Sequence, residues 1–85
     1  MLGFAGKDKE AAMDDEVYAT HTHIARVRVI QTVKGLYRGF VYLRGIGEDP
    51  ETAERHRAKD EFARETEARE AARALASKLL EARKP

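Results

Sequence analysis

The chain of 85 residues contains no cysteine, so neither a disulfide bond nor a thiolate metal site can stabilise it. It also lacks tryptophan and asparagine and has one serine and one glutamine, whereas alanine and arginine are abundant. This bias is typical of a GC-rich bacterial coding sequence. A chain of this length forms one domain, whose single core is only marginally sufficient for folding.

Long apolar runs are also missing from the sequence. No segment approaches the roughly 20 consecutive apolar residues that a membrane span needs. The amino terminus has no basic stretch followed by an apolar run of the length of a secretory signal. We therefore expect a soluble, cytoplasmic protein that makes no contact with a membrane.

Composition divides the chain into a tail and a domain. Residues 1–15 are short of apolar side chains and rich in Lys, Asp, Glu, Gly and Ala, so they bury too little surface to offset the entropy of ordering them. The sequence predicts a mobile acidic tail over 1–15 and a single small α+β domain over 16–85.

Residues 17–43 are rich in β-branched and aromatic side chains, with one interruption at Lys34-Gly35. This pattern predicts a long antiparallel hairpin. A two-residue loop at Lys34-Gly35 places Val29 opposite Phe40. Because side chains alternate along a strand, the expected core face consists of Val27, Val29, Val33, Leu36, Phe40 and Tyr42.

The segment after the hairpin has strong helix propensity. Asp49-Pro50-Glu51 is typical of a helix start, and neither Gly nor Pro occurs from Glu51 to Lys84, so a helix is the favoured interpretation of the whole segment. The alternative is a third edge strand over 55–62, followed by a shorter helix from about Ala63. An apolar stripe is present only from Ala68 to Leu80, through Ala72, Leu75, Ala76 and Leu79.

The fold class that follows is α+β: an antiparallel β-hairpin or small three-stranded sheet packed by a long carboxy-terminal helix. Leu75, Leu79 and Leu80 are the helix residues expected to meet the core face of the sheet. One helix stripe covers only one face of a sheet, so we expect the other face to be used in a homodimer.

Candidate sites for chemistry are few. The lone Ser77 lies far in sequence from any histidine, and Gly45-x-Gly47 lacks the third glycine and the Lys-Ser or Lys-Thr of nucleotide-binding loops. His21 and His23, two apart on an expected strand, point to one side and are weak candidates for a metal site. Structural zinc normally has four protein ligands. We expect no enzyme activity, no cofactor and no bound metal.

Charge is segregated along the chain. Between Val17 and Gly47 there are five basic residues and no Asp or Glu, while the whole chain has a net charge of +1. Arginine and aromatic side chains on strands can contact phosphates, guanine edges and unstacked bases. The candidate nucleic-acid-binding residues are Arg26, Arg28, Lys34, Tyr37, Arg38 and Arg44.

The expected hairpin register divides these candidates between two faces, with Arg26, Arg28 and Tyr37 on one and Arg38 and Arg44 on the other. That division weakens the field on either face. The leading hypothesis is therefore a non-enzymatic binding or assembly module that acts through protein-protein contacts as a homodimer. The alternative is a nucleic-acid-binding protein that uses the basic β-hairpin.

Overall fold

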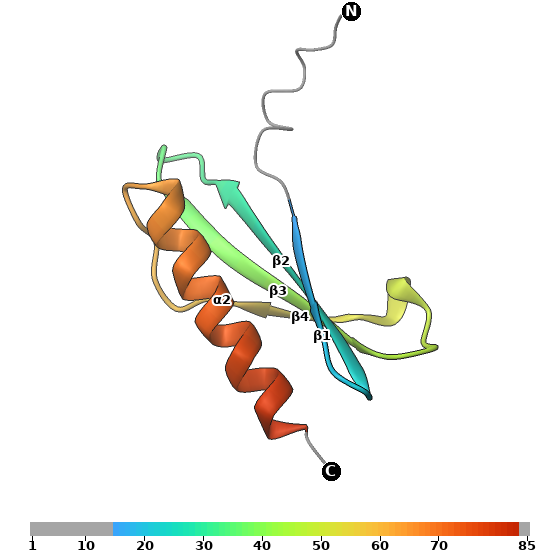
Figure 1. Ribbon diagram of the computed structural model, residues 1–85. Helices are drawn as coiled ribbons and strands as arrows, with labels where there is room; N and C mark the ends of the chain where they lie inside the picture. Colours follow the sequence, from blue (N-terminus) through green and yellow to red (C-terminus); the bar gives the residue numbers. More distant parts are fainter. Residues whose placement is uncertain (1–14, 84–85) are drawn as a thin grey trace, which may run out of the picture.

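The computed structural model describes residues 15–83 (Figure 1). The elements are, in order, β1 (Glu16–Ala19), β2 (His23–Gln31), β3 (Tyr37–Gly45), the short 3-10 helix η2 (Pro50–Thr52), β4 (Glu54–Arg57) and α2 (Glu65–Ala82). The strands form one antiparallel four-stranded sheet in the order β1-β2-β3-β4, and α2 packs on one face of it. The α+β class with a carboxy-terminal helix is confirmed. The tail predicted for 1–15 lies outside the described residues except at Asp15.

The turn between β2 and β3 is one residue longer than the sequence suggested. The backbone N–H of Thr32 donates to the Leu36 carbonyl at 2.7 Å, so Val33, Lys34 and Gly35 form a three-residue loop. The Thr32 hydroxyl accepts hydrogen bonds from two N–H groups within this loop region. Gly35 has a φ of +85°, as the last position of such a loop requires.

This extra residue shifts the register of the hairpin. Val27 pairs with Val41, and Arg28 pairs with Phe40, so the expected pairing of Val29 with Phe40 is wrong. A shift of one residue moves every side chain of a strand to the opposite face. Phe40 and Tyr42 therefore lie on the face away from the helix, and Val33 is fully exposed in the loop.

The segment before the helix is extended rather than helical. Glu54–Arg57 forms β4 on the outer edge of β3, and Phe62 makes a further backbone bridge with Tyr37. Asp49 caps only the single turn of η2. The favoured helix from Glu51 is wrong. The alternative of an edge strand followed by a shorter helix is confirmed, although the strand ends at Arg57 instead of Phe62 and the helix begins at Glu65.

The core lies between α2 and the sheet. The sheet contributes small aliphatic residues and α2 contributes an alanine stripe with Leu80 at its end, while Leu75 and Leu79 pack against its side. The expected helix stripe is thus confirmed. Of the six sheet residues expected in the core, Val27 and Val29 are confirmed and Leu36 is only half-buried, while the expectation is wrong for Val33, Phe40 and Tyr42. The buried members of this core are Ala25, Val27, Val29, Val41 and Leu43 from the sheet and Ala68, Ala72, Ala76 and Leu80 from α2.

Helix and sheet lie very close together at Gly39 in β3. A Cβ atom at this position would lie 2.6 Å from the Ala72 Cβ and 2.7 Å from the Ala68 carbonyl oxygen. Such distances are far below van der Waals contact, so only glycine fits without a shift of the helix. The alanine stripe of α2 and Gly39 together explain how the helix lies so close to the strands.

Candidate nucleic-acid interface

The face of the sheet opposite α2 carries most of the arginine in the strands. Cross-strand partners in register show two rows that each run from β2 through β3 to β4. One row is Arg26-Tyr42-Arg55 and the other is Arg28-Phe40-Arg57. We call this surface the open face; its side chains, by strand alternation, are Val17, Ala19, Ile24, Arg26, Arg28, Ile30, Arg38, Phe40, Tyr42, Arg44, Arg55 and Arg57.

A guanidinium from each row lies over the aromatic ring of the other row. The Arg28 guanidinium carbon lies 5.7 Å from the centre of the Tyr42 ring, and that of Arg55 lies 5.3 Å from the centre of the Phe40 ring. Both distances are within the range of cation–π attraction. Phe40 is only 8% exposed although no helix covers it, so its arginine neighbours shield it from water.

Asp15 is the acid that lies against the β2 arginines. Its carboxylate accepts two hydrogen bonds from the Arg28 fork, at 2.9 and 3.2 Å, and lies 3.6 Å from an Arg26 nitrogen. The hydrogen bonds from Arg28 hold the pKa of Asp15 below its usual value. Arg26 and Arg28 nevertheless keep 50% and 46% of their side chains exposed.

The two arginines of β3 lie toward the ends of the open face. Arg38 lies 3.7 Å from the Glu61 carboxylate, and its buried Nε has no hydrogen-bond partner. Arg44 donates to the Glu48 carbonyl at 2.9 Å. Both guanidiniums are therefore held by the segments that follow β3 and β4.

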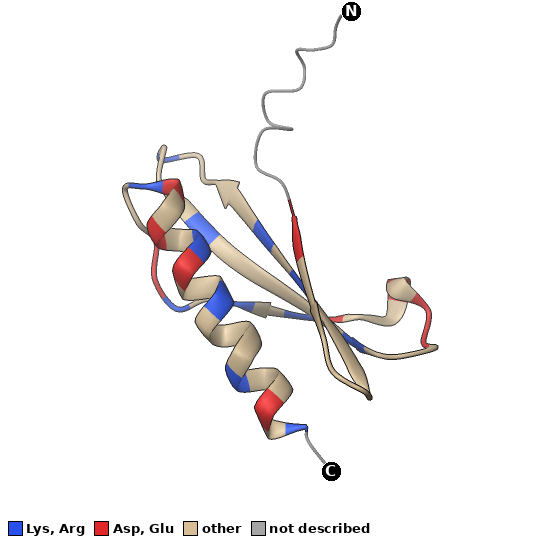
Figure 2. Ribbon diagram, in the orientation of Figure 1, with Lys and Arg blue, Asp and Glu red and all other residues tan. Residues whose placement is uncertain are grey.

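The β4 arginines have no acidic partner among residues 15–83. Arg55 and Arg57 are exposed, and within the described part of the chain no carboxylate lies within ion-pair distance of either. Figure 2 shows positive segments on β2, β3 and β4, and both positive and negative segments on α2; the other negative segments fall on the starts of β1 and β4 and on the loops. The open face is therefore the positive side of the sheet.

The structure brings together four of the six residues that the sequence proposed for nucleic-acid binding. Arg26, Arg28, Arg38 and Arg44 share the open face, so their expected division between two faces is wrong. Lys34 is exposed in the β2–β3 loop at the end of the hairpin. Tyr37 is half-buried and, by strand alternation, lies on the helix side.

Sequence reasoning missed Arg55 and Arg57, because it placed them in a helix. The signal was present as the alternation Arg55-x-Arg57 directly before Ala58, which is typical of an edge strand with one basic side. Helix propensity outweighed this short pattern.

The histidines do not form the strand pair that the sequence suggested. His21 lies in the bend before β2, and His23 is the first residue of the strand. The Nδ1 atom of His23 is 2.9 Å from the Thr22 hydroxyl. Across residues 15–83 no group of three or more His, Asp or Glu side chains is placed to hold a metal ion.

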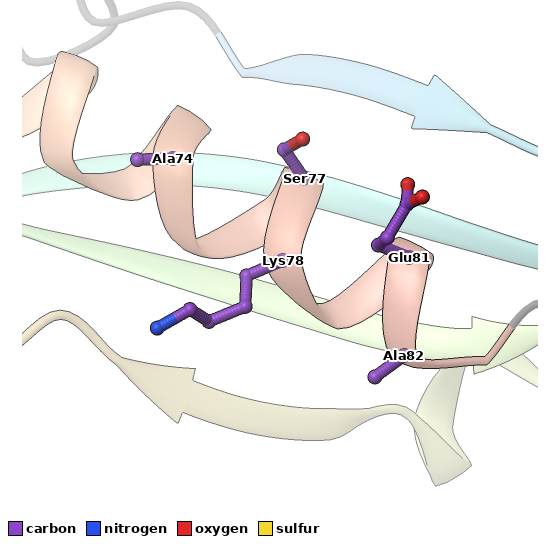
Figure 3. A pocket seen from close by; sticks show the side chains of 5 residues that line it. All are labelled: Ala74, Ser77, Lys78, Glu81 and Ala82. Atoms are coloured by element: carbon purple, nitrogen blue, oxygen red, sulfur yellow. The ribbon is translucent and has the colours of Figure 1, made fainter.

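A shallow hollow lies on the outer side of α2, lined by Ala74, Ser77, Lys78, Glu81 and Ala82 (Figure 3). In Figure 3 the Ser77 and Glu81 side chains point to one side of the helix, while Lys78 points to the other. Side chains that diverge in this way cannot surround a ligand or form a nucleophile–base pair, which requires hydrogen-bond distance. The hollow carries no chemistry comparable to that of the open face.

No match to this chain was found among protein-family models, curated proteins or solved structures. In the part of the chain that the structure covers, no helix combines the length and the apolar character needed to cross a membrane. Function is therefore inferred from the chain's own residues.

Proposed function

We propose that this protein binds nucleic acid through the open face of its sheet. The observation that carries the proposal is the pair of Arg-aromatic-Arg rows, Arg26-Tyr42-Arg55 and Arg28-Phe40-Arg57, on three adjacent strands. With Arg38 and Arg44, which the neighbouring segments hold, six arginines share one surface. Arginine supplies forked donors that match phosphate oxygens and the edge of guanine.

A purely protective role explains this pattern less well. Basic side chains on edge strands prevent sheets from pairing with one another, which accounts for Arg55 and Arg57 on β4. Four of the six arginines lie on β2 and β3, the two central strands, whose edges are already paired. A concentration of positive charge on the interior strands favours an anionic ligand.

The proposal is tested by fluorescence anisotropy of labelled oligonucleotides, titrated with protein at 50 and 200 mM salt. Arg57→Glu is the principal variant because Arg57 is exposed and has no acidic partner within residues 15–83. Its matched control is Lys78→Glu, the same charge reversal on the exposed side of α2. We expect Arg57→Glu to weaken binding roughly tenfold at low salt and to reduce the slope of log K against log salt, since each phosphate contact contributes about −0.9 to that slope.

Two results would contradict the proposal. One is the absence of binding at 50 mM salt by a wild-type protein that is folded. The other is an equal effect of Arg57→Glu and Lys78→Glu, which would show that only the net charge of the molecule matters.

Assembly through protein contacts as a homodimer is a second proposal, and the observation that favours it is the edge strand β1. Val17 and Tyr18 are 54% and 39% exposed and lie on opposite sides of this strand. An edge strand with exposed β-branched and aromatic residues is a site for pairing with another chain. We expect the solution mass to be that of two chains at tens of micromolar and to fall to one chain on Val17→Lys; a single-chain mass for the wild type would contradict this proposal.

A further inference from the structure

The two aromatic rings of the open face are covered by guanidinium groups. Arg55 lies over Phe40 and Arg28 lies over Tyr42. Phe40 retains 8% exposure, and Tyr42 is half-buried. The surface that a ligand meets therefore consists mainly of guanidiniums rather than of ring faces.

This covering distinguishes between two kinds of nucleic acid. Proteins that bind single strands stack successive bases on exposed aromatic rings. On the open face a base would first have to displace Arg55 or Arg28, and Arg28 is also held by two hydrogen bonds to Asp15. A duplex, by contrast, presents phosphates and base edges and needs guanidiniums rather than free rings.

The width of the Arg-aromatic-Arg rows matches one groove of a DNA duplex. Neighbouring strands lie about 4.8 Å apart, so the arginines of β2 and β4 in each row start about 10 Å apart, on either side of β3. The major groove of B-DNA is about 12 Å wide and accepts a two-stranded β-ribbon, so the three strands of the rows would lie across the mouth of the groove and reach into it with their side chains. Arg26 of β2 and Arg57 of β4 can therefore reach phosphates on the two walls of the groove. Arg28 and Arg55, which lie over the rings of β3, then face the base edges.

The charges at the two ends of the sheet decide which end can lie closest to the DNA. The loop between β2 and β3 carries the exposed Lys34. The segment between β3 and β4, at the other end, carries the exposed acids Glu48, Asp49 and Glu51, which repel phosphates. At the Lys34 end the acids Asp15 and Glu61 pair with arginines of the open face, which leaves Asp60 as the exposed acid near the Tyr37–Phe62 bridge. With fewer exposed acids, the hairpin end with Lys34 is the end that can lie closest to the DNA backbone.

From these observations we infer that the ligand of the open face is duplex DNA, bound in its major groove by the arginines of β2 and β4. This inference rests on the proposed function and specifies its ligand. The major groove of A-form RNA is too deep and narrow for side chains to read, so duplex RNA of the same sequence should bind more weakly.

The test compares four labelled 20-nucleotide probes by anisotropy in one buffer: a DNA duplex, each of its two separate strands, and the RNA duplex of the same sequence. We expect the DNA duplex to bind at least tenfold more tightly than either strand or the RNA duplex. Arg26→Gln should weaken duplex binding about tenfold, while Tyr42→Leu should change it less than threefold. Thermal unfolding of both variants shows whether they are folded at the assay temperature.

The outcomes separate this inference from the proposed function. The duplex assignment would be overturned if single strands bound as tightly as the duplex and Tyr42→Leu weakened that binding roughly tenfold. The open face would then be a base-stacking surface. Equal affinity for DNA and RNA duplexes would overturn major-groove binding. Failure of all four probes to bind would overturn the proposed function itself.

Discussion

The two faces of the sheet are built from the same strands but have opposite chemistry. Toward α2 the strands present small aliphatic residues such as Val27, Val41 and Leu43, all nearly inaccessible to water. Away from α2 the alternate positions hold arginines and two aromatic rings. One face stabilises the fold by burying apolar surface, which leaves the other free to carry charge.

The faces also differ in how their apolar groups are covered. On the helix side, an alanine stripe lies close against the sheet at Gly39. On the open face, Phe40 is shielded by charged side chains such as Arg55, whose aliphatic stems and planar heads can cover apolar surface. The face that was expected to be used in a homodimer therefore carries charged side chains that a single chain can expose to water, and the homodimer stays a prediction.

Gly39→Ala should show the largest effect, because it tests the close contact that defines the helix side. The new Cβ would meet Ala72 and the Ala68 carbonyl at 2.6 and 2.7 Å, and overpacking of this kind costs about 1–3 kcal/mol. Urea unfolding, monitored by circular dichroism, measures the decrease in the free energy of unfolding.

Gly45→Ala is the control for this substitution. Its Cβ would meet only the Glu48 carboxylate, at 3.1 Å, and this flexible side chain can move away. A loss of stability in Gly45→Ala as large as that in Gly39→Ala would show that the effect comes from strand propensity and not from the helix contact.

The helix and the class of the fold could be predicted from the sequence, because both depend on patterns that extend over many residues. The stripe from Ala68 to Leu80 repeats at helical spacing and is buried as expected. The two hairpin strands, β2 and β3, were recognisable from their β-branched composition, whereas β1 was expected to continue into β2. In both cases many side chains indicate the same structure.

The open face could not be predicted, because the register of β2 and β3 changes when the loop between them is one residue longer. The Thr32 side chain organises a three-residue loop, whereas Lys34-Gly35 alone suggested two residues. The resulting shift turned Phe40 and Tyr42 from expected core residues into members of the arginine rows. β4 was only the second choice for a different reason: its four residues pair with β3 through long-range contacts, and helix propensity alone cannot reveal such contacts.

Asp15 and Glu16 are adjacent acids whose side chains contact opposite faces of the sheet. Asp15 lies against Arg26 and Arg28 on the open face. Glu16 bonds instead to Arg73 and Arg69 of α2, at 2.8 and 3.4 Å, and so joins β1 to the helix. A substitution that removes the charge of Asp15 therefore alters the open face, and one that removes the charge of Glu16 alters the helix side.

Glu16→Gln should lower stability in a pH-dependent way. The hydrogen bonds from Arg73, and then that from Tyr18, lower the pKa of Glu16 to about 2 from an ordinary value of 4.5. A carboxyl whose pKa is depressed by folding stabilises the protein above its unfolded pKa, and this contribution is lost as the pH falls through the folded value. The free energy of unfolding of wild type should therefore exceed that of Glu16→Gln by about 1 kcal/mol or less at pH 7. This difference should shrink as the pH falls from about 4.5 to about 2.

Thermal unfolding at pH 7, 5, 4, 3 and 2 measures this difference. Arg83→Gln serves as a comparison, because Arg83 bonds at 3.2 Å to the exposed Glu54 carboxylate, whose exposed fraction is 62%, and an exposed pair contributes little. A constant difference between wild type and Glu16→Gln from pH 7 to pH 2 would mean that the link between β1 and α2 does not depend on the charge of Glu16.

Asp15→Asn should give the smallest effect, and it should change the affinity for DNA instead of the stability. If phosphates approach Arg26 and Arg28, the Asp15 carboxylate already occupies the position where an anion would bind, since three guanidinium nitrogens converge on it within 3.6 Å. Removing its charge should raise the affinity for a DNA duplex about two- to fourfold at 50 mM salt, and less at 200 mM because the Debye length shortens. Glu16→Gln removes the same charge one residue away on the helix side and should change the affinity less. Weaker binding by Asp15→Asn would reverse this assignment, because it would mean that the carboxylate holds the Arg28 fork in its binding position rather than competing with the phosphate.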